Sequence, residues 1–307
     1  MSFFTIGIDT ESDNAWNSAE KIKLDNFDEI PRFQNLCERY NIIPTYFLTY
    51  EYAIHKPAID FFKSKIIDKK CEIGQHFHSW STPDKIDKNF EVDSKWIHAY
   101  QYELPDDIFI KKSEILYNTI KKNFDILPKS YRAGRYGIDQ RTVDWLCSKG
   151  FHVDSSVVSN NDYRRNKGKD CSGPNFLNYS SELFRWYDKH KIKYVNEYPI
   201  SSVYPSYLSR GLLWIPLFKK LLNRLGFAKP LRPYPNNLLE INKIINNLYS
   251  KGQNINMMLH SSELCLGCSP ISMNKSDYDS IWFNIEETFI LINKLGLIST
   301  EISNIKK

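Results

Sequence analysis

Short apolar runs alternate with longer amphipathic segments along most of this 307-residue chain. The short runs, which predict buried strands, cover residues 3–8, 42–48, 71–75, 130–132, 151–154, 194–199 and 255–259. The longer segments repeat apolar residues at helical spacing and cover residues 25–40, 58–69, 106–123, 141–149, 238–251 and 276–295. Strand–helix repetition of this kind predicts a parallel sheet with helices outside it, either open or closed into a barrel.

Side chains capable of chemistry gather at the ends of the predicted strands. In parallel α/β sheets, active sites lie at the carboxyl ends of the strands, whether the sheet is open or closed. The residues at these positions are Asp9, Glu11, His76, His78, Arg132, Asp154 and His260. We therefore expect them to form one site.

An acidic turn follows the first predicted strand. Alternate side chains of an extended segment point the same way, so Asp9, Glu11 and Asp13 could share a face. Three carboxylates that converge without a cation repel one another and their pKa values rise, and a divalent metal relieves that repulsion. The alternative is an ordinary solvated loop between a strand and a helix.

A pair of histidines closes the third predicted strand. His76 and His78 are two residues apart, so in extended chain they project to one side and can bind a single ion. The alternative is a packed or solvent-exposed histidine without a ligand. Neutral imidazoles together with a carboxylate are the ligand set of a catalytic zinc site that keeps positions open for water and substrate.

Two further segments add charged and titratable groups. Residues 131–137 carry Arg132 and Arg135, which could orient carboxylates or meet an anionic substrate group, and two glycines that let the backbone approach a ligand closely. His260 ends an apolar run and is a candidate general acid at the mouth of a barrel. The alternative for His260 is a histidine that is satisfied within the core.

The order of these segments resembles the polysaccharide deacetylase (NodB-homology, carbohydrate esterase family four-like) family, in particular its WbmS-like branch of surface-polysaccharide biosynthesis. The matching motifs are Asp-x-Glu, Glu-Ile-Gly-x-His, Tyr-Arg-Ala-Gly-Arg, Gly-Phe-x-x-Asp-Ser-Ser and Leu-His-Ser-Ser-Glu-Leu, between about Thr5 and Leu264. The resemblance implies one domain over residues 1–307 with an insertion at about 155–235. It also implies a distorted (β/α) barrel of about seven parallel strands.

The resemblance further implies a divalent metal, most often zinc, whose ligands follow by position. Glu11 matches the carboxylate ligand and His76 the first histidine ligand. The family's usual second histidine lies four residues after the first, where this chain has Trp80, so we expect His78 to take its place. If His78 points away, too few protein ligands remain and a binding-only role gains ground.

The catalytic residues follow from the same resemblance. Asp9 matches the catalytic base and His260 the catalytic acid. Arg132 matches the arginine that holds the catalytic aspartate, and Asp154 matches the aspartate that tunes the terminal histidine. Leu259 matches the wall of the acetyl pocket. The implied reaction is hydrolysis of an N-acetyl group from an amino sugar.

Substrate contacts are expected from Trp80, Arg135 and Tyr136, with a backbone N–H near Arg135 stabilising the oxyanion. Trp80, Trp96 and Tyr100 could stack on a sugar ring. The sugar could be free, nucleotide-linked or lipid-linked. Basic residues within 164–169 could bind the phosphate of such a carrier, and a solvated loop is the alternative.

Charge and hydropathy bear on partners and location. The formal net charge is +5 and the lysines are scattered, without the basic stripe of a nucleic-acid-binding protein. The N-terminal segment lacks the features of a signal peptide, and no run approaches the roughly 20 apolar residues of a membrane span. We therefore expect a cytoplasmic protein with no transmembrane segment and no nucleic-acid partner. Residues 210–227 are apolar and basic and could contact a membrane surface, with an outer helix as the alternative.

Two other functions remain open from the sequence. One is a catalytically inactive relative that only binds glycan. The other is a hydrolase of a formamide or of an O-acyl ester on a related sugar, because the same site chemistry serves all three bonds.

Overall fold

The computed structural model of the chain describes residues 2–15, 22–83, 98–204 and 228–306. Its main element is a nine-stranded sheet in the order β10-β1-β2-β3-β4-β5-β7-β6, with β11 (Ile298–Ser299) added beside β1. The strands that run parallel along this path are β10 (Ile255–His260), β1 (Phe3–Thr10), β2 (Pro44–Leu48), β3 (Glu72–Phe77), β4 (Ser130–Ala133), β5 (Val153–Asp154) and β7 (Tyr194–Glu197). The edge strand β6 (Phe184–Tyr187) is antiparallel to β7.

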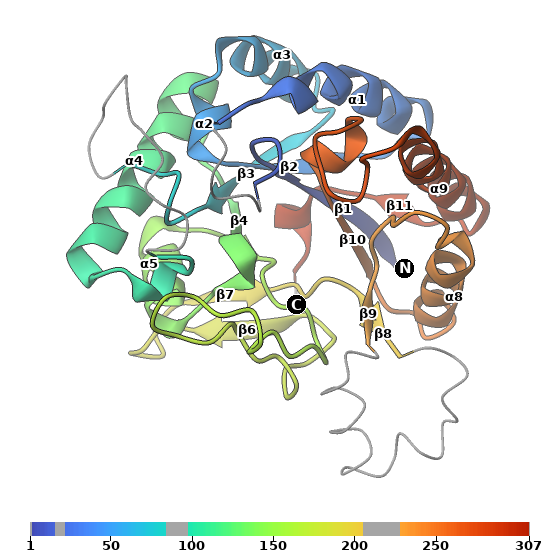
Figure 1. Cartoon of the computed structure of the whole chain (residues 1–307). Coiled ribbons are helices and arrows are strands. Elements are labelled where there is room, and N and C mark those ends of the chain that lie inside the picture. Colours follow the sequence, from blue (N-terminus) through green and yellow to red (C-terminus); the bar gives the residue numbers. More distant parts are fainter. Residues whose placement is uncertain (1, 16–21, 84–97, 205–227, 307) are drawn as a thin grey trace.

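Helices form an arc around the outside of the curled sheet (Figure 1). They are α1 (Ile30–Arg39), the short α2 (Tyr50–Ala53), α3 (Lys56–Ile67), α4 (Asp106–Phe124), α5 (Gln140–Lys149), α8 (Leu238–Tyr249) and α9 (Lys275–Lys294). The ends of α5 follow from local chemistry, because the Asp139 carboxylate accepts a hydrogen bond from the Thr142 N–H and Gly150 adopts the left-handed conformation that ends the helix.

The gap between the first and last strands of the sheet is bridged by irregular chain. The Ser201 N–H donates to the Asn256 carbonyl at 2.9 Å, and the Met258 N–H donates to the Leu231 carbonyl at 3.1 Å. Nearby, β8 (Ser202–Val203) and β9 (Lys229–Pro230) form a separate two-stranded sheet. The result is a curled, mostly parallel α/β sheet, which confirms the predicted distorted (β/α) barrel.

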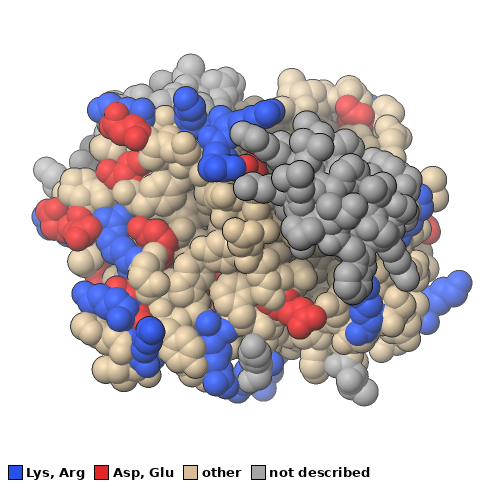
Figure 2. All heavy atoms as spheres, turned by 90° about the horizontal axis from the view of Figure 1, so that it is seen from below, with Lys and Arg blue, Asp and Glu red and all other residues tan. Residues whose placement is uncertain are grey.

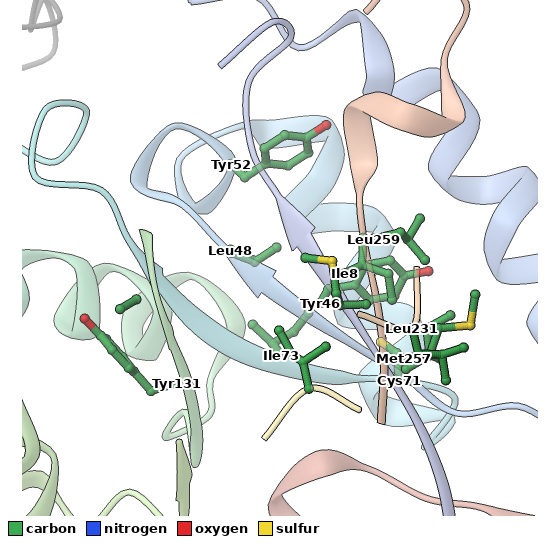
Figure 3. Close-up of a cluster of buried hydrophobic side chains, with 14 of the residues drawn as sticks. Ile8, Tyr46, Leu48, Tyr52, Cys71, Ile73, Tyr131, Leu231, Met257 and Leu259 are labelled. Atoms are coloured by element: carbon green, nitrogen blue, oxygen red, sulfur yellow. The ribbon is translucent and has the colours of Figure 1, made fainter. Parts of the chain in front are cut away.

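The hydrophobic core between sheet and helices takes alternate residues of each strand. Ile8 of β1, Tyr46 of β2 and the β10 residues Met257 and Leu259 are fully buried and gather in one cluster (Figure 3). Because successive side chains of a strand point to opposite faces, the residues between them point into the barrel. Asp9 therefore faces the barrel interior at the end of β1.

Several features of the fold differ from the prediction or extend it. Strand β1 runs on to Thr10 and β10 to His260, so Asp9 and His260 belong to strands that the sequence ended earlier. Strand β6 lies in a stretch for which the sequence predicted no strand, because its edge position buries only alternate residues in part. Residues 210–227, considered above for membrane contact, lie outside the described residues.

The surface and the helices bear on partners. On the face seen from below, Lys and Arg side chains are interleaved with Asp and Glu (Figure 2). Among the described residues, no helix combines the length and the apolar character needed to cross a membrane.

Candidate metal and active site

Strand pairing brings residues from the first and the last long strands of the chain together at the site. In the parallel register of β1 and β10, Asp9 lies directly beside His260. Glu11 follows β1, where its N–H donates to the Ser261 hydroxyl at 3.2 Å and its carbonyl accepts from the Asn26 side chain at 3.0 Å. These contacts fix the backbone of Glu11 against the residue that follows His260.

Asp13 does not share the face of Asp9 and Glu11. Its carboxylate accepts hydrogen bonds from the backbone N–H groups of Asp25 at 2.8 Å and Asn26 at 3.1 Å. The chain turns after Glu11, so the alternation of an extended segment stops there. The expected row of three carboxylates is therefore reduced to two, and the third fastens the loop.

The histidine pair, His76 and His78, sits at the carboxyl end of β3. His76 Nδ1 lies 2.9 Å from the Arg132 carbonyl, which can only accept, so Nδ1 carries a proton and Nε2 is the nitrogen that can bind an ion. The two Nε2 atoms are 3.0 Å apart. The His78 ring stacks on Trp80 with centroids 4.2 Å apart. Both histidines therefore point to one spot.

Glu11, His76 and His78, called here the Glu–His–His cluster, form a possible metal site. Glu11 Oε2 lies 3.1 Å from His78 Nε2 and 3.6 Å from His76 Nε2. Ligands about 2.1 Å from a tetrahedral ion are about 3.4 Å from one another, so these separations are close to those of a zinc-type site. The donor set, two imidazoles and one carboxylate, is also that of a catalytic zinc with an open position.

Gly134 makes room for the second histidine of the cluster. It follows β4, and a Cβ added to it would lie 2.6 Å from His78 Cδ2 and 2.7 Å from the Phe77 carbonyl oxygen. Neither neighbour can move without disturbing β3 or the cluster. A residue without a side chain is therefore required at this position.

Arg132 forms a buried ion pair with Asp9. Its side chain is fully buried, with Nη1 2.7 Å from Asp9 Oδ1 and Nε donating to the Ser155 carbonyl at 2.8 Å. The guanidinium also lies 4.4 Å from the centre of the Phe47 ring. It crosses the barrel over Gly7, where a Cβ would lie 2.6 Å from Nη2. The expected contact between Arg132 and Asp9 is present.

The charges of the site are mutually stabilised. Burial alone would raise the pKa of Asp9, but the Arg132 guanidinium leads the charges that outweigh it, and the pKa lies below its usual value. Burial would likewise raise the pKa of Glu11, but His260 and then the histidine pair hold it well below its usual range. Burial would lower the pKa of His76, and Asp9 and Glu11 raise it instead. Both carboxylates are therefore ionised near neutral pH.

The two ring nitrogens of His260 have different surroundings. Nε2 faces the pocket, and Nδ1 contacts an ion pair. Its Nε2 lies 3.7 Å from Asp9 Oδ2 and 3.9 Å from Glu11 Oε1. Its Nδ1 lies 2.8 Å from Glu263 Oε1 and 2.7 Å from Arg232 Nη2, and Arg232 and Glu263 form an ion pair. Burial and then Arg232 lower the pKa of His260 to about 4, so the ring is neutral near pH 7.

The carboxylate beside His260 is Glu263, which corrects the expectation for Asp154. Asp154 instead accepts from the Ser156 hydroxyl at 2.7 Å and hydrogen-bonds Glu197 on the neighbouring strand β7. In the strand order β5 lies between β4 and β7 and β10 lies beside β1, so Asp154 and His260 belong to strands that do not pair. Burial and then Asp154 raise the pKa of Glu197 well above its usual range, so the carboxyl pair retains a proton.

A pocket of about 320 Å³ opens over the site. The described residues that line it are Asp9, Glu11, Ala15, His76, His78, Trp80, Tyr100, Arg135, Tyr136, Tyr163, Asn166, Arg232 and His260. Trp80, Arg135 and Tyr136, expected to bind substrate, are among them. Trp96, another candidate for stacking, lies outside the described residues.

Leu259 is not part of the described pocket lining, which corrects the expectation that it forms the acyl wall. It is fully buried in the core cluster with Ile8 and Tyr46 (Figure 3). Adjacent residues of a strand face opposite sides, so Leu259 must turn away from the pocket that His260 lines. Met258, two residues before His260, points into the barrel, where its sulfur lies 3.8 Å from the Tyr136 hydroxyl.

Arg135 and Tyr136 hold unusual backbone conformations at the pocket wall. Their φ angles are 52° and 60°, in the left-handed region that side chains disfavour. Strain of this kind persists where the surrounding structure fixes it, and it concentrates at functional sites. Here it directs two adjacent side chains toward one cavity.

Four residues of the site and its surroundings were missed from the sequence: Arg232, Glu263, Tyr163 and Asn166. Glu263 could have been found, because it lies three residues after His260 in a motif that was already singled out. Arg232, Tyr163 and Asn166 lie within the range expected as an insertion, where no periodic pattern indicated which residues return to the site.

Comparisons with known proteins concern the fold. No protein-family model and no curated protein matches the chain. A 4-alpha-glucanotransferase from Thermococcus litoralis aligns with a TM-score of 0.52 and 13% identity over 95% of this chain and 37% of that chain. A presumed polysaccharide deacetylase from Mycobacterium smegmatis aligns with a TM-score of 0.49 and 13% identity, over 94% and 83%.

A carbohydrate esterase family four pseudoenzyme from Bacillus anthracis is also similar, with a TM-score of 0.44 and 9% identity, over 98% of this chain and 64% of that chain. At these identities, the likeness to the glucanotransferase supports the shared α/β barrel fold and nothing further.

Proposed function

We propose that this protein is a metal-dependent hydrolase that removes an N-acetyl group from an amino sugar during surface-polysaccharide biosynthesis in the cytoplasm. The observation that carries the proposal is the convergence of the Glu–His–His cluster, the Asp9–Arg132 pair and His260 on one 320 Å³ pocket. The resemblance of the motifs to polysaccharide deacetylases agrees with this chemistry, and zinc is the ion that the donor set favours.

A divalent ion held by Glu11, His76 and His78 would polarise the acyl carbonyl and lower the pKa of a water molecule. The fixed protonation of His76 supports this assignment, because its Nδ1–H is engaged by the Arg132 carbonyl and Nε2 is left to coordinate. Trp80 stacks on His78 and limits where that ring can move.

Asp9 is the proposed base. It is a buried carboxylate whose Oδ1 is bound by Arg132, so Oδ2 is the oxygen that faces the pocket. A carboxylate that is ionised and fixed in orientation can take the proton of the attacking water. The developing oxyanion is proposed to be met by a backbone N–H near Arg135, as expected from the sequence.

His260 is the proposed acid for the leaving amine. We assign the proton of His260 to Nδ1, where Glu263 accepts it, and Arg232 then donates to the same carboxylate and not to the ring. This leaves the Nε2 lone pair facing Asp9 Oδ2 at 3.7 Å. The proton that Asp9 removes from water can then pass to Nε2 and on to the amine nitrogen as the C–N bond breaks. Glu263 stabilises the imidazolium that forms in between, in the way a buried carboxylate supports a catalytic histidine.

The proposal is tested by acetate release from a panel of N-acetylated amino sugars, with the zinc-loaded protein and the variant Asp9→Asn. The variant keeps the shape of the side chain and the cluster, so zinc content should stay at one per chain while kcat falls by at least about a hundredfold. Asp60→Asn, the same change on the outer helix α3, is the matched control and should retain full activity.

The outcomes separate the alternatives. Zinc-loaded protein that binds these sugars but releases no acetate would indicate the glycan-binding role instead. Release of formate, or of acetate from O-acetylated sugars alone, would indicate the formamide or ester hydrolase. Wild-type kcat in Asp9→Asn would refute the base assignment.

A further inference from the structure

One wall of the pocket is a loop whose backbone groups are hydrogen-bonded to neighbouring side chains. Residues 163–173, called here the basic loop, contribute Tyr163 and Asn166 to the pocket lining. The Tyr100 hydroxyl donates to the Asn166 carbonyl, and Glu103 accepts from the Asp170 N–H at 3.1 Å. The loop is therefore held in place against residues 100–103.

Two glycines allow this close packing. A Cβ at Gly168 would collide with the Glu103 carboxylate, and a Cβ at Gly173 would collide with the Tyr163 carbonyl and the Tyr100 hydroxyl. Burial alone would raise the pKa of Glu103, but backbone N–H donors from residues around it lower the pKa, so Glu103 accepts as a carboxylate. The loop is thus built with a defined shape beside the pocket.

The contacts that hold the loop use its backbone and leave basic side chains at the surface. Arg165, Lys167 and Lys169 are exposed, whereas Arg164 forms a two-point ion pair with Asp162. From the other wall, Arg135 Nη2 donates to the Lys167 carbonyl at 3.4 Å, and its guanidinium stacks 4.4 Å from the centre of the Tyr100 ring. A guanidinium of the pocket lining thus meets the basic loop.

The pocket is small, so the outer substituent of a larger substrate reaches its walls, one of which is this loop. At 320 Å³ the pocket is at the small end of ligand sites, with room for about one sugar ring and its acyl group. If the acyl group lies at the Glu–His–His cluster, the rest of a larger substrate must extend out of the pocket along its walls. The charged residues of the lining are Asp9, Glu11, Arg135 and Arg232. Their two negative and two positive charges cancel in the absence of a bound metal ion. A bound divalent cation makes the lining positive.

We propose that the acetylated sugar is delivered as a phosphate ester, and that its anionic phosphate is bound between Arg135 and the side chains of Arg165, Lys167 and Lys169. This inference rests on the proposed function and narrows its substrate class. Guanidinium and ammonium groups are the usual partners of phosphate oxygens. The phosphate could belong to a sugar 1-phosphate, a nucleoside diphosphate or a lipid diphosphate, which share this chemistry.

The test measures binding separately from turnover. Calorimetric titration compares N-acetylglucosamine with its 1-phosphate on the zinc-loaded Asp9→Asn variant, which should bind without turnover. The same comparison on metal-free protein excludes capture of the phosphate by the ion itself. We expect at least about tenfold tighter binding of the phosphorylated sugar at low salt, since charge-assisted contacts are the added interaction. The preference should weaken as ionic strength rises. The uridine-diphosphate sugar and the farnesyl-diphosphate sugar then distinguish a nucleotide from a lipid carrier.

Charge-matched variants locate the effect. The triple variant Arg165→Gln, Lys167→Gln and Lys169→Gln should lose the preference for the phosphorylated sugar. The control triple variant replaces three exposed lysines between β6 and β7, at the amino end of β7 and so at the opposite end of the sheet from the site, and it should keep the preference. The control positions are Lys189, Lys191 and Lys193.

Each outcome bears on one proposal. Equal affinity for the two sugars, no binding of the phosphorylated sugar at millimolar concentration, or a preference that survives the loop variant would each overturn this inference. Acetate release from neutral and phosphorylated sugars at equal kcat/KM would overturn it while leaving the proposed function intact. Tight binding of the phosphorylated sugar without acetate release by the zinc-loaded protein would instead contradict the proposed function.

Discussion

The Asp9–Arg132 ion pair should be strongly coupled, and a double-mutant cycle can measure it. Arg132 is completely buried and its Nη1 lies 2.7 Å from Asp9 Oδ1. Arg132→Met keeps an apolar chain of similar length but leaves the Asp9 carboxylate buried without its counter-ion, which costs about 3–5 kcal/mol of unfolding free energy. Asp9→Asn leaves the guanidinium with the Ser155 carbonyl and hydroxyl, so its cost is smaller, about 1–3 kcal/mol.

The double variant removes both charges at once. Its loss of unfolding free energy should therefore be less than the sum of the two single losses by about 1–3 kcal/mol. Urea unfolding of metal-free protein at pH 7, followed by far-ultraviolet circular dichroism, gives the four free energies. A parallel cycle on the exposed Lys56–Asp60 pair of α3 should show a coupling below about 0.5 kcal/mol.

Two results would refute this reasoning. Additive losses in the Asp9–Arg132 cycle would mean that the buried pair is not a coupled unit. An equal coupling in the surface pair would mean that burial does not strengthen the interaction. Unchanged m-values are needed for either comparison, because they show that the variants unfold from a native state of the same compactness.

Three further predictions concern other parts of the molecule. Gly134→Ala should push His78 aside and weaken zinc binding about tenfold in a competition titration, and unchanged affinity would contradict the packing argument. Zinc at a hundred times its Kd should raise the unfolding midpoint of the 307-residue chain by about 4 °C, from ~2.7 kcal/mol of linkage, and a His78→Ala variant should show much less. The raised pKa of Glu197 means that the unfolded chain releases this proton above about pH 4.3 while the native state keeps it to higher pH. The stability of the wild type therefore falls as pH rises from 5 to 8, and Glu197→Gln should gain stability relative to it over this range in urea unfolding. The same difference at both pH values would show that folding does not raise the pKa of Glu197.

Much of the site was predictable because each element carries its own pattern. The spacing of His76 and His78 on one strand determines that both can face one ion, and the structure brings their Nε2 atoms within 3.0 Å. The same period-two rule could have shown that Leu259 faces away from the side of His260. Leu259 was assigned to the acyl pocket from the resemblance alone, and the alternation of side chains along the strand contradicts that assignment.

Other features depend on which strands become neighbours. Asp154 was paired with His260 by resemblance, but β5 and β10 are not neighbours in the sheet, and Glu263 occupies the position beside the ring. Arg232 reaches His260 from 28 residues earlier in the chain, across the seam that irregular segments bridge. No local spacing could have indicated either contact.

The sequence by itself determined the alternation of strands and helices, the placement of carboxylates and imidazoles at strand ends, and the glycines beside them, because these depend on periodicity and local geometry. Only the tertiary structure decided which of those groups meet, since the curl of the sheet and the order of its strands set distances between residues that are far apart in the chain. It also decided their charge states, because burial and the neighbouring ions together set each pKa.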